Sequence, residues 1–365
     1  MSRIIFFSRD YTTHDYRFLS ALANSQYEVF FLRLERNKTQ FEDRPLPSGI
    51  RQIPWVGGKK VVKIFDSPNL LVDLRRVIRD INPDLIQAGP LQRCAFLVAL
   101  LGFKPLVSTS WGYDLLMDVN RNQVWRWVTQ FTLRRSAIMV GDCDTIRQKA
   151  IELGMPDDKI VIFPWGIDLN SFNPGEYPPK QGDQFTILST RGWEPIYGVD
   201  ILAKAFVKAA KQFQELRLVL LGNGSQANYL RNIFTRGGVM DRVLFPGQVT
   251  QADLPHYFNM ADLYVSASHT DGSSVSLMEA LACGRPVVVS DIPGNREWVE
   301  PGINGWWFKD GQVDDLALKL SQAFHQRQNL TAMSKAARQV AEERADWDNN
   351  FPNLLKAYDV VLKQV

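Results

Sequence analysis

The chain has 365 residues, of which 45% are hydrophobic and 22% charged, and its formal net charge is +3 at pH 7. This length favours two domains, each large enough for its own core, and the composition is ordinary for a globular protein. A net charge of +3 is too weak to indicate nucleic-acid binding. The three cysteines, Cys94, Cys143 and Cys283, are widely spaced without a metal-ligand pattern. We therefore expect small, buried thiols in a reduced, cytoplasmic protein.

Neither a signal peptide nor a membrane-spanning helix is expected. The first apolar segment, Arg3–Phe7, is too short for the core of a signal peptide and predicts a strand. The longest apolar run, Ala95–Phe103, is far shorter than the ~20 residues that a spanning helix needs. The sequence thus predicts a soluble or at most peripheral protein.

Short apolar runs alternate with helical patterns along the chain, which is typical of parallel α/β sheets. In chain order, strands are predicted at Ile4–Ser8, Val29–Leu34, Asp84–Ala88, Leu106–Ser110, Ile138–Val140, Ile160–Phe163, Thr186–Ser189, Arg217–Leu221, Val243–Phe245, Leu263–Ser266 and Val287–Ser290. Helical periodicity is clearest at Tyr16–Ala23, Leu70–Asp80, Thr145–Leu153, Ile201–Phe213 and Val313–Gln326.

Two tandem, doubly wound Rossmann-like domains are the natural interpretation of this pattern. The segment Asp168–Asp183 is rich in Asn, Pro and Gly and predicts a linker. We expect a first domain over residues 1–170 and a second over 171–348. The amphipathic stretch 349–365 is expected to pack back on the first domain.

The segment His269–Asp291 carries the clearest functional signal. Asp271 and Glu279 stand eight positions apart, joined by a small, hydroxyl-rich turn that leads into a predicted helix, Ser276–Ala282. Because this turn follows the strand Leu263–Ser266, it lies where ligands bind in open α/β sheets. Free N–H groups at the helix start favour a diphosphate. Gly272, Ser273 and Ser274 are small enough to let the backbone approach it closely, and Val275 is a further candidate donor contact.

Two carboxylates flank this anion site. Asp271 can accept hydrogen bonds from sugar hydroxyls, and Glu279, one turn into the helix, can accept both hydroxyls of a ribose. Taken singly, Asp271 is better explained as a helix cap and Glu279 as a solvated helix residue. Their combination with the turn, Gly284, Pro286 and the valine-rich strand favours a nucleotide-sugar site.

This segment resembles the signature of the retaining glycosyltransferases of family 4, which adopt the GT-B fold of two facing Rossmann-like domains with the donor site in the cleft. That signature is two acids separated by seven residues, then Ala, a small residue, Gly, Pro and a valine-rich strand. Asp271 stands where most members have Glu. Three further blocks, Phe163–Pro174, Val243–Ser268 and Pro293–Gly311, are similar to the family's neighbouring blocks.

The resemblance implies further donor contacts. Arg191, at the end of a strand, matches the family's diphosphate-binding arginine, whereas Tyr197 stands where the family has a second, lysine cation. Lys204, Arg285 or Arg296 are candidates for the missing charge. The residues implied to border the nucleotide and its base are Gly222, Asn223, Phe245 and Pro246.

The first domain departs further from the family. The loop after the first strand, Ser8–Asp15, lacks the family's Gly-Gly pair, and Trp111 replaces the family's sugar-facing His. Asp114 matches the following acid and, with Asp271 and Arg191, is a candidate catalytic residue. The candidate contacts to sugar or acceptor are Asp10, His14, Trp111, Tyr113 and Tyr197.

The stretch Arg121–Ser136 combines Trp125, Trp127 and Phe131 with several arginines. Such a basic, aromatic face could contact anionic lipid headgroups at the inner face of a membrane. Burial of Trp125 and Val128 in the core, with the arginines in water, is the alternative.

The sequence therefore predicts a retaining glycosyltransferase that transfers a sugar from a UDP-sugar, with GDP-sugar as the alternative donor. The acceptor is a saccharide, a lipid-linked saccharide or a small molecule, and the product has an alpha linkage. No metal or other cofactor is expected, because arginine and helix N–H groups meet the diphosphate. A sugar-nucleotide epimerase or hydrolase of the same fold and a non-catalytic nucleotide-binding subunit stay open. A dinucleotide dehydrogenase is disfavoured, because no G-x-G-x-x-G follows the first strand.

Overall fold

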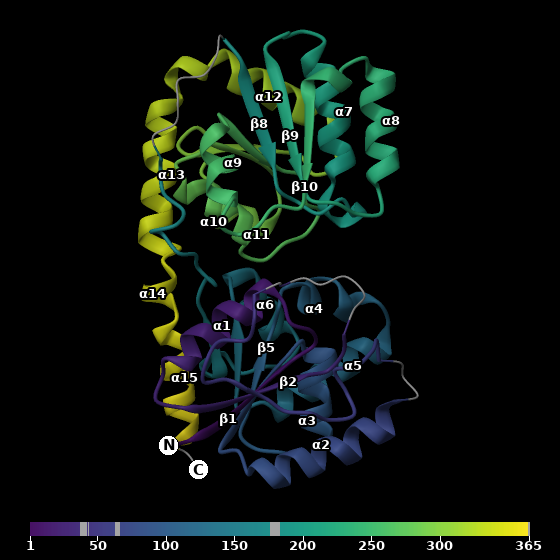
Figure 1. Cartoon of the computed structure of the whole chain (residues 1–365), viewed down its shortest axis with the longest axis vertical. Helices are drawn as coiled ribbons and strands as arrows, with labels where there is room; N and C mark the ends of the chain where they lie inside the picture. Colours follow the sequence, from purple (N-terminus) through teal and green to yellow (C-terminus); the bar gives the residue numbers. More distant parts are fainter. Residues whose placement is uncertain (37–41, 43, 63–65, 176–182, 364–365) are drawn as a thin grey trace. The chain divides into compact units, whose positions relative to one another are not determined.

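The computed structural model describes residues 1–36, 42, 44–62, 66–175 and 183–363, so residues 176–182 of the predicted linker lie outside the described part. The chain divides into two compact units. Unit 1 comprises Met1–Phe163 and Phe351–Val365, and unit 2 comprises Pro164–Asn350. Each unit is a parallel sheet covered by helices (Figure 1).

Unit 1 is built on a seven-stranded parallel sheet with the order β3-β2-β1-β4-β5-β6-β7. Its strands are β1 (Arg3–Ser8), β2 (Glu28–Arg33), β3 (Arg51–Gln52), β4 (Leu85–Gly89), β5 (Leu106–Thr109), β6 (Ile138–Gly141) and β7 (Ile160–Ile162). β1, β4, β5 and β6 carry almost uninterrupted buried residues, as expected for a sheet covered on both faces.

The helices of unit 1 follow the strands in alternation. They are α1 (Thr13–Ala23), α2 (Ser67–Ile81), the π-helix η2 (Leu91–Ala95), α3 (Phe96–Leu100), α4 (Tyr113–Leu116), α5 (Gln123–Arg135) and α6 (Asp144–Glu152). α2 packs Leu70, Leu74 and Val77 against Ile5 and Phe7 of β1. On the other side of β1, Phe6 contacts Phe18 of α1, with ring centroids 6.2 Å apart.

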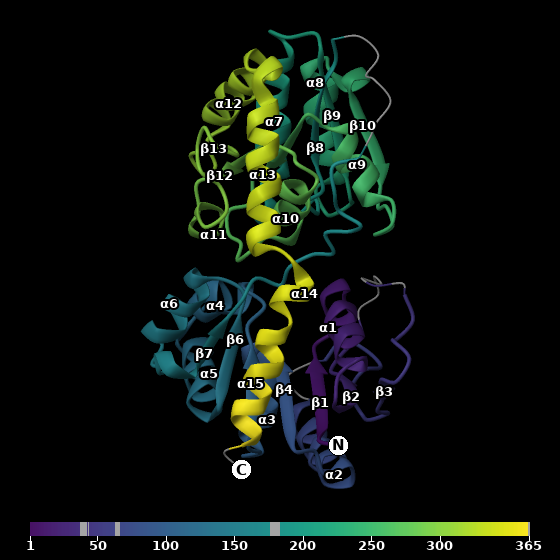
Figure 2. The same cartoon turned by 90° about the vertical axis from the view of Figure 1, so that its left-hand side faces the viewer.

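One further helix of unit 1 comes from the far end of the chain. α15 (Pro352–Leu362) lies beside the strands of this sheet, as Figure 2 shows. Tyr358 is fully buried and its hydroxyl donates to the Gln87 side chain of β4. Tyr27 donates to Asp359 at 2.7 Å. Residues more than 250 positions apart thus share one core.

Unit 2 is built on a six-stranded parallel sheet with the order β10-β9-β8-β11-β12-β13. Its strands are β8 (Phe185–Ser189), β9 (Leu216–Leu221), β10 (Val243–Gly247), β11 (Leu263–Ser266), β12 (Val287–Ser290) and β13 (Gly305–Phe308). Because β8 lies next to β9 on one side and β11 on the other, the order reverses between β8 and β11. At such a reversal, the connections that follow the two strands lead to opposite faces of the sheet, so their loops separate.

Helices cover both faces of this sheet. α7 (Val199–Ala210), α8 (Ala227–Gly237) and α12 (Val313–His325) share one apolar cluster with residues such as Ile187 and Leu218. α9 (Leu254–Met260), α10 (Val275–Ala282) and α13 (Leu330–Arg344) share the other with Leu188 and Val219. The short helices α11 (Pro293–Arg296) and α14 (Trp347–Asn350) complete the unit.

The predicted class of fold, two Rossmann-like parallel α/β domains, is confirmed. The bounds of Leu263–Ser266 and Val287–Ser290 are as predicted. β3 and β13 were not predicted, and β3 has only two residues, too few to show a pattern. α6 begins at Asp144, and Cys143 occupies its cap position.

All three cysteines are buried thiols outside any disulfide, which confirms the prediction for them. Among the described residues, no helix combines the length and apolar character that crossing a membrane requires.

Candidate functional site

The predicted donor residues gather at the carboxyl edge of the sheet of unit 2, where the strand order reverses. Arg191 lies two residues beyond β8, and Asp271 lies in the loop between β11 and α10. Their side chains meet across the reversal, with Arg191 Nη2 2.7 Å from Asp271 Oδ2. The structure thus joins two residues that are 80 positions apart in the sequence.

Arg191 is held on several sides. Its Nη1 donates to the hydroxyls of Ser274 and Ser276, at 3.0 Å each. The Tyr197 ring lies against the guanidinium, with its centroid 4.3 Å from Cζ. Only 12% of the Arg191 side chain is exposed. Burial lowers the pKa of Arg191, but Asp271, Tyr264 and Tyr197 together outweigh it, so the pKa lies above its usual value. A positive charge is therefore fixed at this point.

Two residues of this network, Ser276 and Tyr264, were not predicted. The Tyr264 hydroxyl donates to Ser276 Oγ at 2.9 Å, and Tyr264 itself is fully buried in β11. A tyrosine within an apolar strand gives no sequence signal for such a contact, because the inward or outward direction depends on register. Ser276 carried a weak signal as a hydroxyl in the first turn of a helix.

The Asp271 loop is supported from behind by α11 and the residues after it. Gly294 packs so closely that an added Cβ would come within 2.5 Å of the carbonyl oxygens of Asp271 and Gly272. Trp298 Nε1 donates to Ser273 Oγ at 3.1 Å. Close packing and this hydrogen bond therefore hold the Asp271 loop in place. Burial raises the pKa of Asp271, and the charge of Arg191 opposes that rise.

Glu279 lies on α10 with only 4% of its surface exposed. Its Oε1 accepts a hydrogen bond from Gln251 at 3.1 Å, a residue that the sequence analysis did not single out. The cap position of α10 is Ser274, which makes no side-chain capping bond, and Val275 is the first helical residue. Asp271 is therefore not the helix cap, which removes the alternative explanation of its position. Nor is Glu279 a solvated helix residue.

The other predicted donor residues lie in the loops after β9 and at the end of β10. Gly222 has φ +93° and donates its N–H to the Gly247 carbonyl at 2.8 Å, so these two loops are adjacent. The Asn223 carbonyl accepts from Trp193 N at 3.0 Å. Phe245 and Pro246 are half-buried in β10, and the Phe245 ring contacts Trp193 with centroids 5.8 Å apart. All four belong to the same edge of the sheet as Arg191.

The three candidates for a second cation are engaged elsewhere. Lys204 pairs with Asp200 at 2.7 Å, and Arg296 pairs with Asp291. Arg285 donates to backbone carbonyls, among them that of Ala261 at 3.0 Å. Tyr197 stands where the family has a lysine, and the positive charge beside it is that of Arg191.

Asp114 lies in unit 1 and is fully buried. Its Oδ1 accepts from the Ser110 hydroxyl at 2.6 Å and from Leu115 N at 3.0 Å. Its Oδ2 accepts from Leu91 N at 3.0 Å, at the start of η2. Burial raises the pKa of Asp114 to about 6, although these hydrogen bonds oppose the rise. The carboxylate holds two loops together, a reason for its position that the sequence did not reveal.

The other candidates of unit 1 lie at the carboxyl edge of its sheet. Asp10 is buried and pairs with Arg33. The half-buried His14 ring packs against Trp111, with centroids 5.7 Å apart, and burial lowers the His14 pKa to about 4. Tyr113 is the first residue of α4 and is half-buried. Tyr197, which was grouped with these residues, lies in unit 2 against Arg191.

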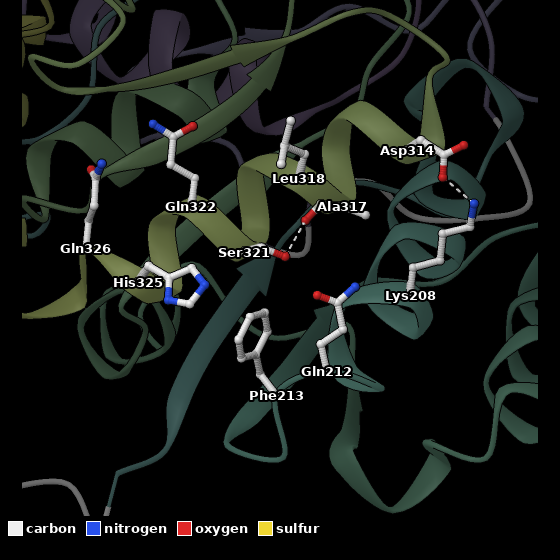
Figure 3. A pocket seen from close by; sticks show the side chains of 10 residues that line it. All are labelled: Lys208, Gln212, Phe213, Asp314, Ala317, Leu318, Ser321, Gln322, His325 and Gln326. Carbon is white, nitrogen blue, oxygen red and sulfur yellow. Dashed lines mark hydrogen bonds and ion pairs between the residues drawn. The ribbon is translucent and has the colours of Figure 1, made fainter.

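A cavity of about 690 Å³ lies elsewhere on unit 2, between α7 and α12 (Figure 3). Its wall includes Phe213, His325 and the Lys208–Asp314 ion pair. None of the predicted donor residues lines this cavity, so we do not assign it to the donor site. Within the described residues, no group of three or more His, Cys, Asp or Glu side chains is placed to hold a metal ion.

Comparisons with known proteins agree with this architecture. Residues 12–166 match the family model described as Glycosyl transferase 4-like domain, and residues 176–340 match the one described as Glycosyl transferases group 1. Together with the two parallel sheets, these matches define the chain as a glycosyltransferase with the GT-B fold.

Individual relatives are distant. An uncharacterized glycosyltransferase of Methanocaldococcus jannaschii is 25% identical over 58% of this chain and 56% of its own length. A GDP-mannose-dependent alpha-(1-6)-phosphatidylinositol monomannoside mannosyltransferase of Mycobacterium tuberculosis is 23% identical over 78% of both chains. The crystal structure of Anabaena HepE in complex with UDP superposes with a TM-score of 0.79, at 20% identity over 99% of this chain and 100% of that one.

Proposed function

We propose that the protein is a retaining glycosyltransferase that transfers a sugar from a UDP-sugar to a hydroxyl group of a glycan or a lipid-linked saccharide, forming an alpha linkage. One observation carries the proposal. Arg191 and Asp271 meet where the strand order of unit 2 reverses, and the buried Glu279 lies on the helix that starts there. A fixed cation, free helix N–H groups and two carboxylates provide for a diphosphate, a sugar and a ribose.

In this proposal each residue has a separate task. Arg191 and the start of α10 hold the diphosphate, and Glu279 accepts hydrogen bonds from the ribose hydroxyls. The diphosphate takes over the donors with which Arg191 now binds Asp271, and Asp271 is released toward the hydroxyls of the transferred sugar. The exchange keeps Arg191 paired with a negative group throughout, so its buried charge is always compensated.

The reaction follows from that arrangement. The acceptor oxygen forms a bond to the anomeric carbon on the face from which the diphosphate leaves, as the bond from that carbon to the phosphate oxygen breaks. The proton of the acceptor hydroxyl passes to the departing diphosphate oxygen. Arg191 and the N–H groups of α10 stabilise the negative charge that develops there. Because these groups supply the positive charge, we propose that activity requires no metal.

Two relatives support a nucleoside diphosphate sugar but differ in its base. The mycobacterial relative is named for GDP-mannose, whereas the Anabaena protein was crystallised with UDP. The same mycobacterial name includes a phosphatidylinositol glycoside, which supports a lipid-linked acceptor. We assign the acceptor to unit 1, with His14, Trp111 and Tyr113 as its contacts and Asp114 as a residue that positions their loop.

Calorimetric titration with UDP and GDP tests the donor site. Glu279→Ala should weaken binding by about tenfold to a hundredfold, because the buried ribose hydroxyls lose a charged acceptor. Glu343→Ala on α13, which removes an exposed carboxylate of the same unit, should leave the affinity unchanged. Equal affinities in the wild type and Glu279→Ala would contradict the site.

Product analysis tests the reaction. Incubating each nucleotide sugar with and without acceptors should release the nucleoside diphosphate and form the alpha-linked product only when an acceptor is present. Activity should persist in EDTA. Sugar conversion without an acceptor would indicate an epimerase instead, and rescue of EDTA-treated protein by Mg²⁺ or Mn²⁺ would contradict metal independence.

A further inference from the structure

The outer face of α5 is apolar, although it points to solvent. Val124 and Trp127 are 67% and 54% exposed, and they stand with Phe131 at helical spacings of three and four residues. The opposite face of the same helix buries Thr129, Thr132 and Leu133 against unit 1. Val124 and Trp127 therefore lie largely outside the core of unit 1, whereas Phe131 is half-buried and packs against it.

The neighbouring helix α3 extends this stripe into a patch. Phe96 contacts two aromatic rings of α5, with centroids 6.3 Å from Trp127 and 5.9 Å from Phe131. The Trp127 and Phe131 rings stack at 5.4 Å. Leu100, one turn after Phe96, is 42% exposed. We call these residues of α3 and α5 the aromatic patch, and both helices are visible in Figure 1.

Positive charge surrounds the aromatic patch. Arg126, Arg134 and Arg135 of α5 are all exposed, and α5 contains no acidic residue. The Arg135 guanidinium lies 5.0 Å from the Phe131 ring centroid, so charge and apolar surface are in direct contact. An exposed apolar stripe with a basic border is complementary to a partner that has an anionic surface and an apolar interior.

We propose that the aromatic patch of α3 and α5 docks unit 1 on a membrane surface that carries anionic phospholipids. Trp127, Phe131 and Val124 enter the boundary between headgroups and acyl chains, and the three arginines contact the phosphates. An aromatic ring with one polar edge suits that boundary, because its apolar body is buried while the indole N–H stays hydrated. The inference needs neither the donor nor the reaction proposed above.

Co-sedimentation of the full chain with vesicles tests the proposal. Vesicles of phosphatidylcholine and phosphatidylglycerol, at about two to one, should bind the protein, and pure phosphatidylcholine should not. Removing two charges with Arg134→Gln/Arg135→Gln should weaken binding about thirtyfold, at ~1 kcal/mol per arginine. Trp127→Ala should weaken it at least about tenfold, because the exposed half of a large ring no longer leaves water.

Matched control variants distinguish binding by the aromatic patch from a nonspecific effect of exposed arginines or exposed apolar side chains. Arg75→Gln/Arg79→Gln removes two exposed arginines of α2, and Val72→Ser removes a valine that is 74% exposed on the same helix. Neither should change vesicle binding. All the altered side chains are exposed, so the thermal unfolding midpoints should stay close to that of the wild type.

Three results would overturn the proposal. Wild-type protein that does not bind the anionic vesicles would exclude a lipid surface. Equal losses in the α2 and α5 variants would show nonspecific attraction. A dimer in light scattering that Trp127→Ala dissociates, without vesicle binding, would identify a second copy of the chain as the occupant. Retention of UDP binding in each case would show that the donor site is intact.

Discussion

The contact between Tyr197 and Arg191 predicts how the diphosphate site responds to the loss of one ring. The guanidinium lies 4.3 Å from the ring centroid, and its side chain is only 12% exposed. A largely desolvated contact of this kind is worth about 1–2 kcal/mol. Tyr197→Ala should therefore weaken UDP binding between about fivefold and thirtyfold. Tyr197→Phe keeps the ring and should bind as the wild type does.

Uridine distinguishes positioning of Arg191 from a general disturbance of the site. Because uridine has no diphosphate, its affinity should be the same in the wild type and in Tyr197→Ala. Calorimetry of both ligands, or of GDP and guanosine if the wild type prefers GDP, measures the two effects separately. Tyr229→Ala is the matched control, since it removes a half-exposed ring 5.5 Å from the Lys204 ammonium. Unchanged UDP affinity, or an equal loss for uridine, would refute the reasoning.

Three further predictions concern charge, pH and backbone. Asp271→Asn should bind UDP about threefold or more tightly, because the carboxylate no longer competes for Arg191, while sugar transfer falls; calorimetry that shows weaker UDP binding would contradict the exchange of partners. The pKa of His14 is lowered by burial from 6.5 to about 4, so the stability it contributes is present above pH 6.5 and is lost as the pH falls from 6.5 to 4. Between pH 6.5 and 4, the free energy of unfolding of His14→Gln should therefore fall by up to about 3 kcal/mol less than that of the wild type, as measured by denaturant titration. Parallel pH profiles of this free energy in the two proteins would argue against a buried neutral His14. Gly198→Ala should destabilise unit 2 by roughly 2–4 kcal/mol, because φ is +58° and the new Cβ would lie 2.1 Å from the Ala267 carbonyl oxygen. Gly238→Ala, with φ +70° and no neighbouring atom within 4 Å, should cost only about 1 kcal/mol, and equal losses would show that the close approach is relieved elsewhere.

The class of fold could be predicted because most strands are short, continuous apolar runs. Two of them, β11 and β12, have the predicted bounds. Such runs report burial on both faces of a sheet, which is a local property of each strand. β13, Gly-Trp-Trp-Phe, was not predicted, although three of its four residues are aromatic and therefore favoured in strands.

The donor residues could be named, but their partners could not. Asp271 and Glu279 stand in one short segment, so their spacing was visible in the sequence. The pairing of Arg191 with Asp271 links residues after two different strands and depends on the strand order. Asp114 shows the same limit, because one of its hydrogen bonds comes from Leu91 of η2, a π-helix that has no sequence signature.

The position of α15 has a consequence for the order in which the protein folds. Its Tyr358 completes the core of unit 1 through Gln87, yet it is synthesised after the whole of unit 2. On the ribosome, residues 1–163 therefore emerge without the helix that carries Tyr358, whereas unit 2 is one continuous segment, Pro164–Asn350. Unit 2 is expected to be the first to reach its native state, although its residues are made later. For most two-domain chains the order of synthesis and the order of completion coincide, and here they are reversed.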